Sequence, residues 1–238
     1  MTPSKAGRRS EPESLIEILM NANNQSSVNP ESLAEHAYHL LEEKLVTLAL
    51  PPGSMVSEGD LIKMIGLGRT PVREAIQRLG HQEFFDILPR RGLLVTPVNR
   101  SSMLQILEAR KPLERLIVYR ASVNAKDDQR GGLSAIAREL TISHDNFHEF
   151  LRLDHKMDEL LDLCAGNPFA TAAVSPLRSH CRRLLHFHRA GMKLSDAISV
   201  NSKMARLVAR REFRGAQKAS DGRIVVLERL IADVDRFS

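Results

Sequence analysis

Three polar side chains spaced four residues apart carry the pattern in this sequence that most directly suggests chemistry. Arg69, Arg73 and Gln77 recur at every fourth position, so on a helix they share one face. In a DNA major groove an arginine can bond bidentately to guanine and a glutamine to adenine. The alternative is an ordinary solvated face, because Arg and Gln are also good helix formers. The surrounding residues must decide between the two.

The segment that carries this row is predicted to be a short helix with a marked start. Thr70 is expected to cap its N-terminus with the hydroxyl, and Pro71 to occupy the first helical position, where a missing N–H costs nothing. Its apolar residues follow the i, i+3, i+4, i+7 rule and are predicted to be buried. They are Val72, Ala75, Ile76 and Leu79.

Two further helices are expected before this segment. The first runs from Glu31 to Ala49 and stops at Pro51-Pro52-Gly53, and the second is short, with Ser57 and Asp60 at the capping-box spacing. A turn at Gly66-Leu67-Gly68 then leads into the arginine-bearing helix, which is a helix-turn-helix arrangement. The predicted inner edge of the first helix consists of Leu33, Ala37, Leu40, Leu41, Lys44, Leu45 and Leu48.

A β-hairpin is expected after the arginine-bearing helix. Residues 84–88 and 93–98 are apolar, β-prone runs separated by a Pro/Gly turn. The tip carries Arg90 and Arg91, which can enter a minor groove or pair with phosphates, and Gly92 would let the backbone approach a phosphate closely. A helix-turn-helix followed by a basic hairpin is a winged helix, and this arrangement favours DNA binding over a solvated face.

At this point the sequence resembles a known family. The stretch Gly68-Arg-Thr-Pro-Val-Arg-Glu-Ala-Ile-Gln-Arg-Leu79, with Pro89-Arg-Arg-Gly92 after it, is similar to the DNA-binding domain of GntR-family bacterial transcription regulators. The resemblance implies base or phosphate contacts from Arg69 and Arg73, a backbone contact from Thr70, and a wing contact from Arg91 with Gly92.

Two positions depart from the family pattern. Gly68 stands where many relatives carry a Ser or Thr that contacts phosphate, and Glu83 stands where they carry a glycine before the wing. We therefore expect a different turn between the helix and the wing.

The chain from Arg100 onward has helical patterns without strand-like alternation, which predicts an all-α bundle of about six helices. Gly131-Gly132 is expected to break the pattern, with a helix beginning at Leu133. Residues 104–114, 153–168 and 175–183 resemble the effector-binding FCD domain of the FadR-type branch of the same family. That resemblance implies a homodimer formed through the bundle, with a small molecule, often a carboxylate, bound inside it.

The same resemblance implies a divalent metal held by one Asp and three His in many relatives. Asp154 keeps the acidic position, but Asp158 stands where the first His is expected. No His follows near Lys203, and none follows Gly215. Asp154 is therefore the one candidate metal ligand, and two carboxylates would hold a hard cation such as Mg²⁺ only weakly.

The candidate effector pocket consists of Arg110, Asp154, Asp158 and His180. Arg110 could bind a ligand carboxylate bidentately, or instead form an internal ion pair with Asp154 or Asp158. His180 is the histidine expected to face inward, although a satisfied core or surface His is more common.

Composition limits the remaining possibilities. The 238 residues have a net charge of +5, no Trp and two cysteines without a CxxC pair, which argues against a disulfide framework and a zinc knuckle. No run is long enough to span a membrane, and no signal peptide is recognised, so a reduced cytoplasmic protein is expected.

The sequence thus predicts a mostly α-helical chain with three parts. These are a flexible arm over residues 1–30, a winged helix-turn-helix of three helices plus a hairpin over residues 31–99, and an effector-binding and dimerisation bundle over residues 100–238. The predicted function is a DNA-binding regulator, and a repressor by analogy, controlled by a carboxylate effector. Two alternatives stay open: an effector-blind DNA-binding dimer with a degenerate pocket, and an enzyme using Asp154, Asp158 and nearby His, for which no nucleophile–base spacing is found.

Overall fold

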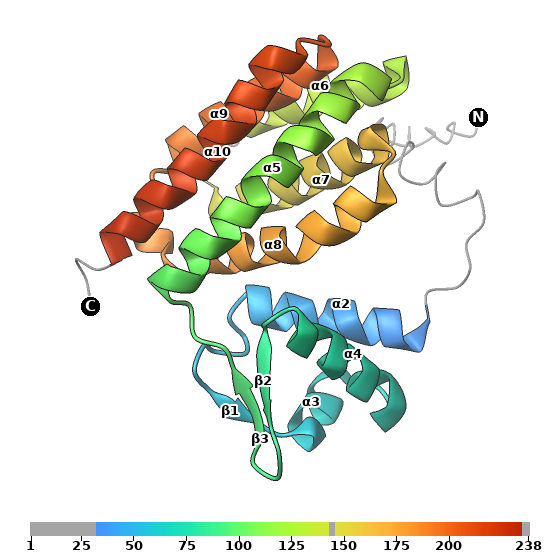
Figure 1. Ribbon diagram of the computed structural model, residues 1–238, viewed down its shortest axis with the longest axis vertical. Helices are drawn as coiled ribbons and strands as arrows, with labels where there is room; N and C mark the ends of the chain where they lie inside the picture. The colour runs from blue at the N-terminus through green and yellow to red at the C-terminus, as the bar shows by residue number, and fades with distance from the viewer. Residues whose placement is uncertain (1–31, 143–145, 235–238) are drawn as a thin grey trace, which may run out of the picture.

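The computed structural model describes residues 32–142 and 146–234. The predicted arm over residues 1–30 lies outside the described residues. Figure 1 shows two units, a small one with helices and a sheet, and a larger helical one above it. We refer to residues 32–99 as the winged-helix unit and to residues 100–234 as the helical bundle.

The winged-helix unit contains α2 (Leu33–Val46), β1 (Met55–Val56), α3 (Glu58–Ile65), α4 (Arg69–His81), β2 (Phe85–Leu88) and β3 (Gly92–Val95). The capping box predicted at Ser57 is present, with Asp60 as its partner, and Gly66 ends α3 in the left-handed region. The strands form an antiparallel sheet in the order β1-β3-β2. The hairpin is therefore confirmed, while the short strand β1 was not anticipated.

The start of α4 differs from the prediction. Gly68 is the N-cap, in extended backbone, and no side chain caps the helix, so Thr70 does not cap it and Pro71 is its third residue. Pro71 is still tolerated there, because the first four N–H groups of a helix have no intrahelical acceptor. The helix begins before Thr70 because the Gly68 carbonyl already accepts the Val72 N–H at 3.4 Å.

The winged-helix unit has its own hydrophobic core, to which α2, α3, α4 and the sheet contribute. All four residues of the predicted inner face of α4 are buried. On α2 the buried edge includes Tyr38, which was not predicted, whereas Leu33 is 66% exposed because it lies at the first helical position. The buried residues of this core are Ala37, Tyr38, Leu41, Leu45, Leu50, Leu61, Val72, Ala75, Ile76, Leu79, Phe84, Phe85, Leu93 and Val95.

The bundle contains six α-helices in the described part of the chain, as predicted. They are α5 (Arg100–Asn124), α6 (Asp127–Ile142), α7 (Phe147–Ala165), α8 (Pro168–Phe187), α9 (Leu194–Ala209) and α10 (Phe213–Val234), with a short 3-10 turn η1 (Arg189–Gly191). Their apolar faces form a second core, separate from the first.

The helix break expected at Gly131-Gly132 is wrong, because α6 runs through both residues. Glycine inside a helix costs about 1 kcal/mol relative to alanine. Gly132, Leu133 and Ile136 are buried, so packing of this face offsets that cost. Among the described residues, no helix combines the length and apolar character that crossing a membrane requires.

Candidate nucleic-acid interface and buried charge cluster

The exposed face of α4 presents the predicted DNA-reading row to solvent. The side chains of Arg69 and Arg73 are 76% and 64% exposed, and Gln77 is exposed as well. They lie opposite the face that buries Val72 and Leu79. The row is thus accessible to a major groove, whose width admits an α-helix.

A carboxylate of α3 lies between the two arginines. Glu58 accepts a hydrogen bond from Arg73 Nε at 2.8 Å, and its other oxygen lies 3.7 Å from Arg69 Nε. An exposed ion pair of this kind adds little to stability. It does place a carboxylate beside both guanidinium groups, a neighbour that the spacing of residues in the sequence does not indicate.

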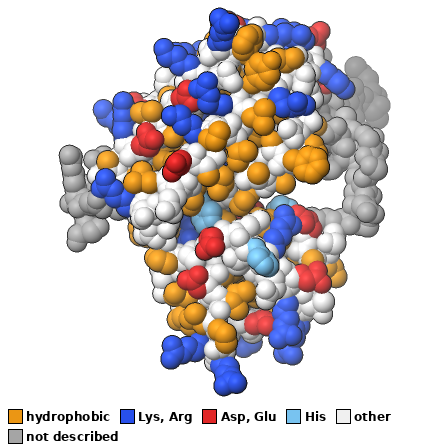
Figure 2. Space-filling view, in the orientation of Figure 1, with side chains coloured by type: hydrophobic (Ala, Val, Ile, Leu, Met, Phe, Trp, Pro, Cys, Tyr) orange, Lys and Arg blue, Asp and Glu red, His pale blue; other side chains and the backbone are white. Residues whose placement is uncertain are grey.

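The wing places its basic tip at the same end of the molecule as α4. Figure 2 shows Lys and Arg side chains gathered at this lower end. The turn closes with a 3.0 Å bond from Arg91 N–H to the Leu88 carbonyl, and Arg90 adopts a left-handed backbone with φ of 64°. Both arginines are exposed, as a contact with phosphate requires.

The structure gives Gly92 a reason that differs from the predicted one. Its φ is +104°, and a Cβ at this position would lie 2.9 Å from the carbonyl oxygen of Val56 in β1. Glycine is therefore required for packing within the sheet, whether or not a phosphate approaches it.

The bundle encloses a buried charge cluster, which we define as three guanidinium groups and three carboxylates. α7 supplies two of the carboxylates one turn apart, and α5, α8 and α10 supply the rest. Every member is at most 6% exposed. The cluster consists of Arg110, Glu114, Asp154, Asp158, Arg178 and Arg223.

Glu114 lies at one end of the cluster. Its Oε1 accepts a hydrogen bond from Arg110 Nε at 2.9 Å, and both of its oxygens accept bonds from Arg178 at 2.9 and 3.1 Å. Arg110 therefore forms an internal ion pair, but with Glu114 rather than with Asp154 or Asp158. Burial alone would raise the pKa of the Glu114 carboxyl, but the guanidinium groups of Arg178, Arg110 and Arg223 hold it well below its ordinary value.

Arg223 lies at the other end, between the two carboxylates of α7. One terminal nitrogen donates to Asp154 Oδ1 at 2.7 Å and the other to Asp158 Oδ1 at 2.9 Å. Asn201 on α9 also donates to Asp154 Oδ1, at 2.7 Å. Asp154 and Asp158, four residues apart, thus face the same side of α7, and both accept hydrogen bonds from donors of the protein itself.

The donor set does not fit the metal site that the resemblance implies. Asp154 and Asp158 are both bonded to a guanidinium, and the side chain that bonds Asp154 from α9 is an amide instead of an imidazole. Across residues 32–142 and 146–234, no three His, Cys, Asp or Glu side chains stand together as metal ligands. Asp154 remains on the predicted face, but as the partner of Arg223 and Asn201.

His180 lies outside the cluster, on the side of α8 that faces the winged-helix unit. Its ring stacks on Phe84 with centroids 3.8 Å apart, and Nε2 lies 2.7 Å from the Gln82 carbonyl oxygen. Burial lowers the pKa of His180 to about 4, so the neutral ring donates to that carbonyl. Next to it, Arg183 donates to the Thr96 carbonyl at 2.6 Å. The expectation that His180 shares a cavity with Arg110 is thus not what the structure shows.

Two open spaces adjoin the cluster. A cavity of about 30 Å³ touches Arg110, Asp154, Asn201 and Arg223, and it has room for one or two water molecules. Its apolar walls are Phe150, Leu185, Ala197, Val200, Val226 and Leu227.

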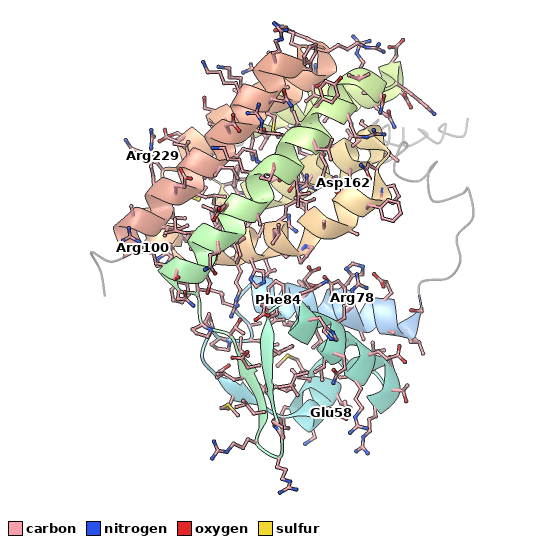
Figure 3. The ribbon with its side chains drawn as sticks, in the orientation of Figure 1. Glu58, Arg78, Phe84, Arg100, Asp162 and Arg229 are labelled. Atoms are coloured by element: carbon pink, nitrogen blue, oxygen red, sulfur yellow. The ribbon has the colours of Figure 1, made fainter. Side chains whose placement is uncertain are left out.

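The second space is a cleft of about 680 Å³ between α2 and the helices α7 and α8. We call it the interdomain cleft. Asp158, Asp162, Arg178 and Arg182 line its bundle side, and Glu42 lines the side of α2. Figure 3 shows Asp162 within the bundle, above this junction. The cluster is therefore reached from the boundary between the two units.

Several of these residues could not be found from the sequence. Glu114, Arg178 and Arg223 are spaced as ordinary charged residues of amphipathic helices, and only the packing of four helices brings them together. Arg110 forms an ion pair, which is one of the two roles that the sequence leaves open, but its partner is Glu114, four residues along the same helix. An i, i+4 Arg–Glu pair on a predicted buried helix is the signal that could have pointed to it.

Comparisons with known proteins agree with this architecture. Residues 33–95 match the model of the family described as bacterial regulatory proteins, gntR family, and residues 105–224 match the FCD domain. The fatty acid metabolism regulator protein of Proteus mirabilis (strain HI4320) is 25% identical over 203 residues, which cover 78% of this chain and 84% of that protein. The HTH-type transcriptional repressor RspR of Escherichia coli (strain K12) is 25% identical over 166 residues, covering 67% and 72% of the two chains.

A solved structure described as E. coli McbR/YncC superposes with a TM-score of 0.73 at 18% identity, and covers 86% of this chain and 98% of its own. At that identity the likeness shows the fold. The FCD match alone spans about half of the chain, and the gntR match immediately precedes it. The chain therefore belongs to the GntR family of bacterial regulatory proteins, with an FCD domain following its DNA-binding winged helix.

Proposed function

We propose that the protein is a sequence-specific regulator that reads an operator with Arg69, Arg73 and Gln77 and anchors with Arg90 and Arg91 of the wing. The observation that carries this proposal is the exposure of the arginine row on α4 at the same end of the molecule as the wing tip. Thr70 and Pro71 would approach the DNA backbone, because helix N-termini commonly contact phosphates. Gly92 would approach it as part of the wing. Its place of action would be the cytoplasm, where the operator is found.

Binding to selected DNA tests this proposal. An operator would be selected from random duplex DNA with the full chain, and affinity measured by fluorescence anisotropy. We expect Arg73→Ala to weaken binding by about 1–3 kcal/mol and to relax base preference at one position. The matched control is Arg229→Ala, which removes an exposed arginine of α10 far from the wing. Equal loss in both variants would contradict the assignment.

We further propose that a small carboxylate controls DNA binding from the bundle, entering through the interdomain cleft. Arg182 is the guanidinium best placed to receive it. Arg178 is fully engaged with Glu114 and Asp162, whereas Arg182, among the described residues, makes a 3.4 Å contact with Asp158 and donates a bond to Ser179. A carboxylate of the ligand could therefore bind Arg182 without breaking a short ion pair.

Such a ligand would bind next to the contact between the two units. Glu42 of α2 lines the interdomain cleft together with Ser179, and it lies in the field of Arg182. The Tyr38 hydroxyl lies 3.0 Å from Glu42 and 2.9 Å from the side chain of Gln82, which is the C-cap of α4. A change at Arg182 can thus alter how α2 and the recognition helix are held, provided that the ligand binds two arrangements with different affinity.

A specific observation supports the alternative of an effector-blind regulator. The inner cavity holds about 30 Å³, and the three positive and three negative members of the buried charge cluster balance each other. A thermal-shift screen with small carboxylates separates the two hypotheses. A ligand present at about 100 times its Kd should stabilise the wild-type fold by about 2.7 kcal/mol, and Arg182→Ala should lose this response. No response from any carboxylate would favour the effector-blind regulator.

We also propose that two copies associate through the outer face of α5 and α10. Leu116, Tyr119 and Val123 are 41 to 49% exposed at a spacing of three and four residues, next to the exposed Phe213 and Val225 of α10. Figure 2 shows an apolar strip along this face. Spacing of this kind suits helix-to-helix packing. A dimer would present two recognition helices to a two-fold operator.

Light scattering on Tyr119→Glu tests the interface, with Phe169→Glu as the control because Phe169 is 87% exposed elsewhere on the bundle. We expect only Tyr119→Glu to yield monomers. Repression, in place of activation, is proposed only by analogy with the E. coli relative whose name describes a repressor.

A further inference from the structure

Arg223 lies between two carboxylates of the bundle, where a metal ion could otherwise bind. Its guanidinium lies between Asp154 and Asp158, which are one turn apart on α7, with 2.7 and 2.9 Å contacts to the two carboxylates. We propose that Arg223 is the fixed cation of this domain. It excludes divalent metals from the site, and its removal uncovers a binding site for a hard divalent cation formed by Asp154, Asp158 and Asn201. This inference goes beyond the proposed function, because it depends neither on DNA binding nor on an effector.

Charge balance supports the exclusion of metal. Three guanidinium groups face three carboxylates in the buried charge cluster, so the cluster is neutral as it stands. A divalent cation added to it would bury two uncompensated positive charges, which is costly in a low-dielectric interior. Without Arg223 the same cluster carries one excess negative charge, so a bound divalent cation would leave one excess positive charge in the interior instead of two.

The geometry of the contacts supports the exclusion as well. Asp154 Oδ1 already accepts two bonds, from Arg223 and from Asn201, and Asp158 Oδ1 accepts one from Arg223. A metal would need these same oxygens. A guanidinium is not deprotonated in proteins, so Arg223 stays charged beside these oxygens.

The donors that Arg223 would leave behind define the class of cation. Asp154 and Asp158 offer carboxylate oxygens, and Asn201 can offer its amide oxygen once the amide rotates away from donating to Asp154. Oxygen donors suit Mg²⁺, Mn²⁺ and Ca²⁺, while imidazole-preferring ions such as Zn²⁺ and Ni²⁺ find no nitrogen ligand among these three residues. The uncovered site is therefore expected to bind Mn²⁺ with modest affinity.

The proposal also explains what Arg223 does for the fold. α10 carries Arg223, α7 carries the two aspartates, and α9 carries Asn201. The guanidinium thus joins α10 to α7, and Asn201 joins α9 to the same Asp154 carboxylate, as a shared metal ion would join the three helices. Unlike a metal, a side chain cannot be removed by a chelator, so we expect the stability of this chain to be insensitive to EDTA.

The experiment compares Mn²⁺ binding by untagged, chelator-treated full-length protein. The main variant is Arg223→Gln, which keeps a hydrogen-bonding side chain but removes the charge. Arg229→Gln on the same helix is the matched control, because Arg229 is exposed. Asp154→Asn/Arg223→Gln is the negative control, because it removes one of the proposed ligands. Binding is followed by the electron paramagnetic resonance of free Mn²⁺ and by thermal shift.

We expect about one Mn²⁺ per chain and a saturable rise in Tm for Arg223→Gln, and neither effect for the wild-type chain, for Arg229→Gln or for the double variant. If Arg223→Gln is unfolded without metal, folding becomes the readout, and recovery of the helical circular dichroism signal on addition of Mn²⁺ supports the proposal. Stoichiometric metal in the wild-type chain, or an Arg223→Gln chain that neither binds Mn²⁺ nor is refolded by it, overturns it.

Discussion

Replacing Asp162 with Asn is expected to stabilise the bundle at neutral pH, although it removes half of an ion pair. Asp162 Oδ2 accepts a 2.8 Å bond from Arg178, but its Oδ1 is buried and has no hydrogen-bond partner among the described residues. Burial raises the pKa of Asp162 to about 6, and the nearby Asp158 adds to this effect, so the attraction of Arg178 is outweighed. The ionised carboxylate is therefore an unfavourable state of the folded protein.

The size and sign of the effect follow from the two pKa values. The carboxyl has an ordinary pKa of 3.8 and a folded value of about 6, so it binds its proton more tightly in the folded state. Stability from this group is present below about pH 4 and is lost as the pH rises towards and past 6. The difference of about 2.2 corresponds to about 3 kcal/mol, most of which falls between pH 4 and pH 8. An asparagine side chain at this position cannot ionise, so the variant would not lose this stability as the pH rises.

Urea unfolding followed by circular dichroism at pH 4, 6 and 8 measures this difference. We expect the free energy of unfolding of Asp162→Asn, relative to the wild type, to increase by about 2–3 kcal/mol from pH 4 to pH 8. Glu159→Gln is the control, since Glu159 is an exposed carboxylate of the same helix and cleft. If Asp162→Asn instead loses stability relative to the wild type as the pH rises, the ion pair with Arg178 dominates and the reasoning is refuted.

Three other substitutions test the winged-helix unit and its contact with the bundle. Gly92→Ala should destabilise the wing by about 1–3 kcal/mol, because the new Cβ meets the Val56 carbonyl at 2.9 Å; unchanged thermal unfolding would argue against this. Glu83→Gly should stabilise by about 1 kcal/mol, because Glu83 has a φ of 64°; a lower Tm would show that its side chain matters. His180→Phe should retain the stack on Phe84 and remove the loss of stability that the wild type suffers as the pH falls from 6.5 towards 4, since folding lowers the pKa of His180 to about 4. Parallel pH profiles of the two proteins would contradict that assignment.

Much of the winged-helix unit could be predicted because its signals are local. Caps, turns and the periodicity of α4 each depend on residues close together in the sequence. The sequence therefore predicts the capping box at Ser57, the buried face of α4 and the hairpin. The start of α4 was misplaced because Thr70 and Gly68 can both act as caps. Backbone geometry, in which Gly68 accepts the first helical bond, decided the outcome. The strand β1 was missed because two residues carry too weak a periodic pattern.

The chemistry of the bundle was less accessible for a different reason. The spacing of Asp154 and Asp158 showed that they share a face, but it did not show what faces them. Arg223 is separated from Asp158 by 65 residues and Arg178 from Glu114 by 64. Such pairings depend on helix packing across the whole bundle. A single sequence can therefore indicate that the histidine ligands of a metal site are missing, but it cannot show which side chain takes the place of the metal.

α8 contributes to both the buried charge cluster and the contact with the winged-helix unit. Arg178 and Arg182 on this helix contact the carboxylates of α5 and α7, while His180 and Arg183 contact residues 82–96 of the winged-helix unit. The residues that contact the carboxylates and those that contact the winged-helix unit alternate within two turns of α8. A rotation or shift of α8 that changes the contacts with the carboxylates must therefore also change the contacts with the winged-helix unit. A ligand bound near Arg182, as proposed above, would therefore need no separate transmitting element to affect the recognition helix. Such coupling would be lost if the ion pairs of Arg178 with Glu114 and Asp162 kept α8 in place when the ligand binds.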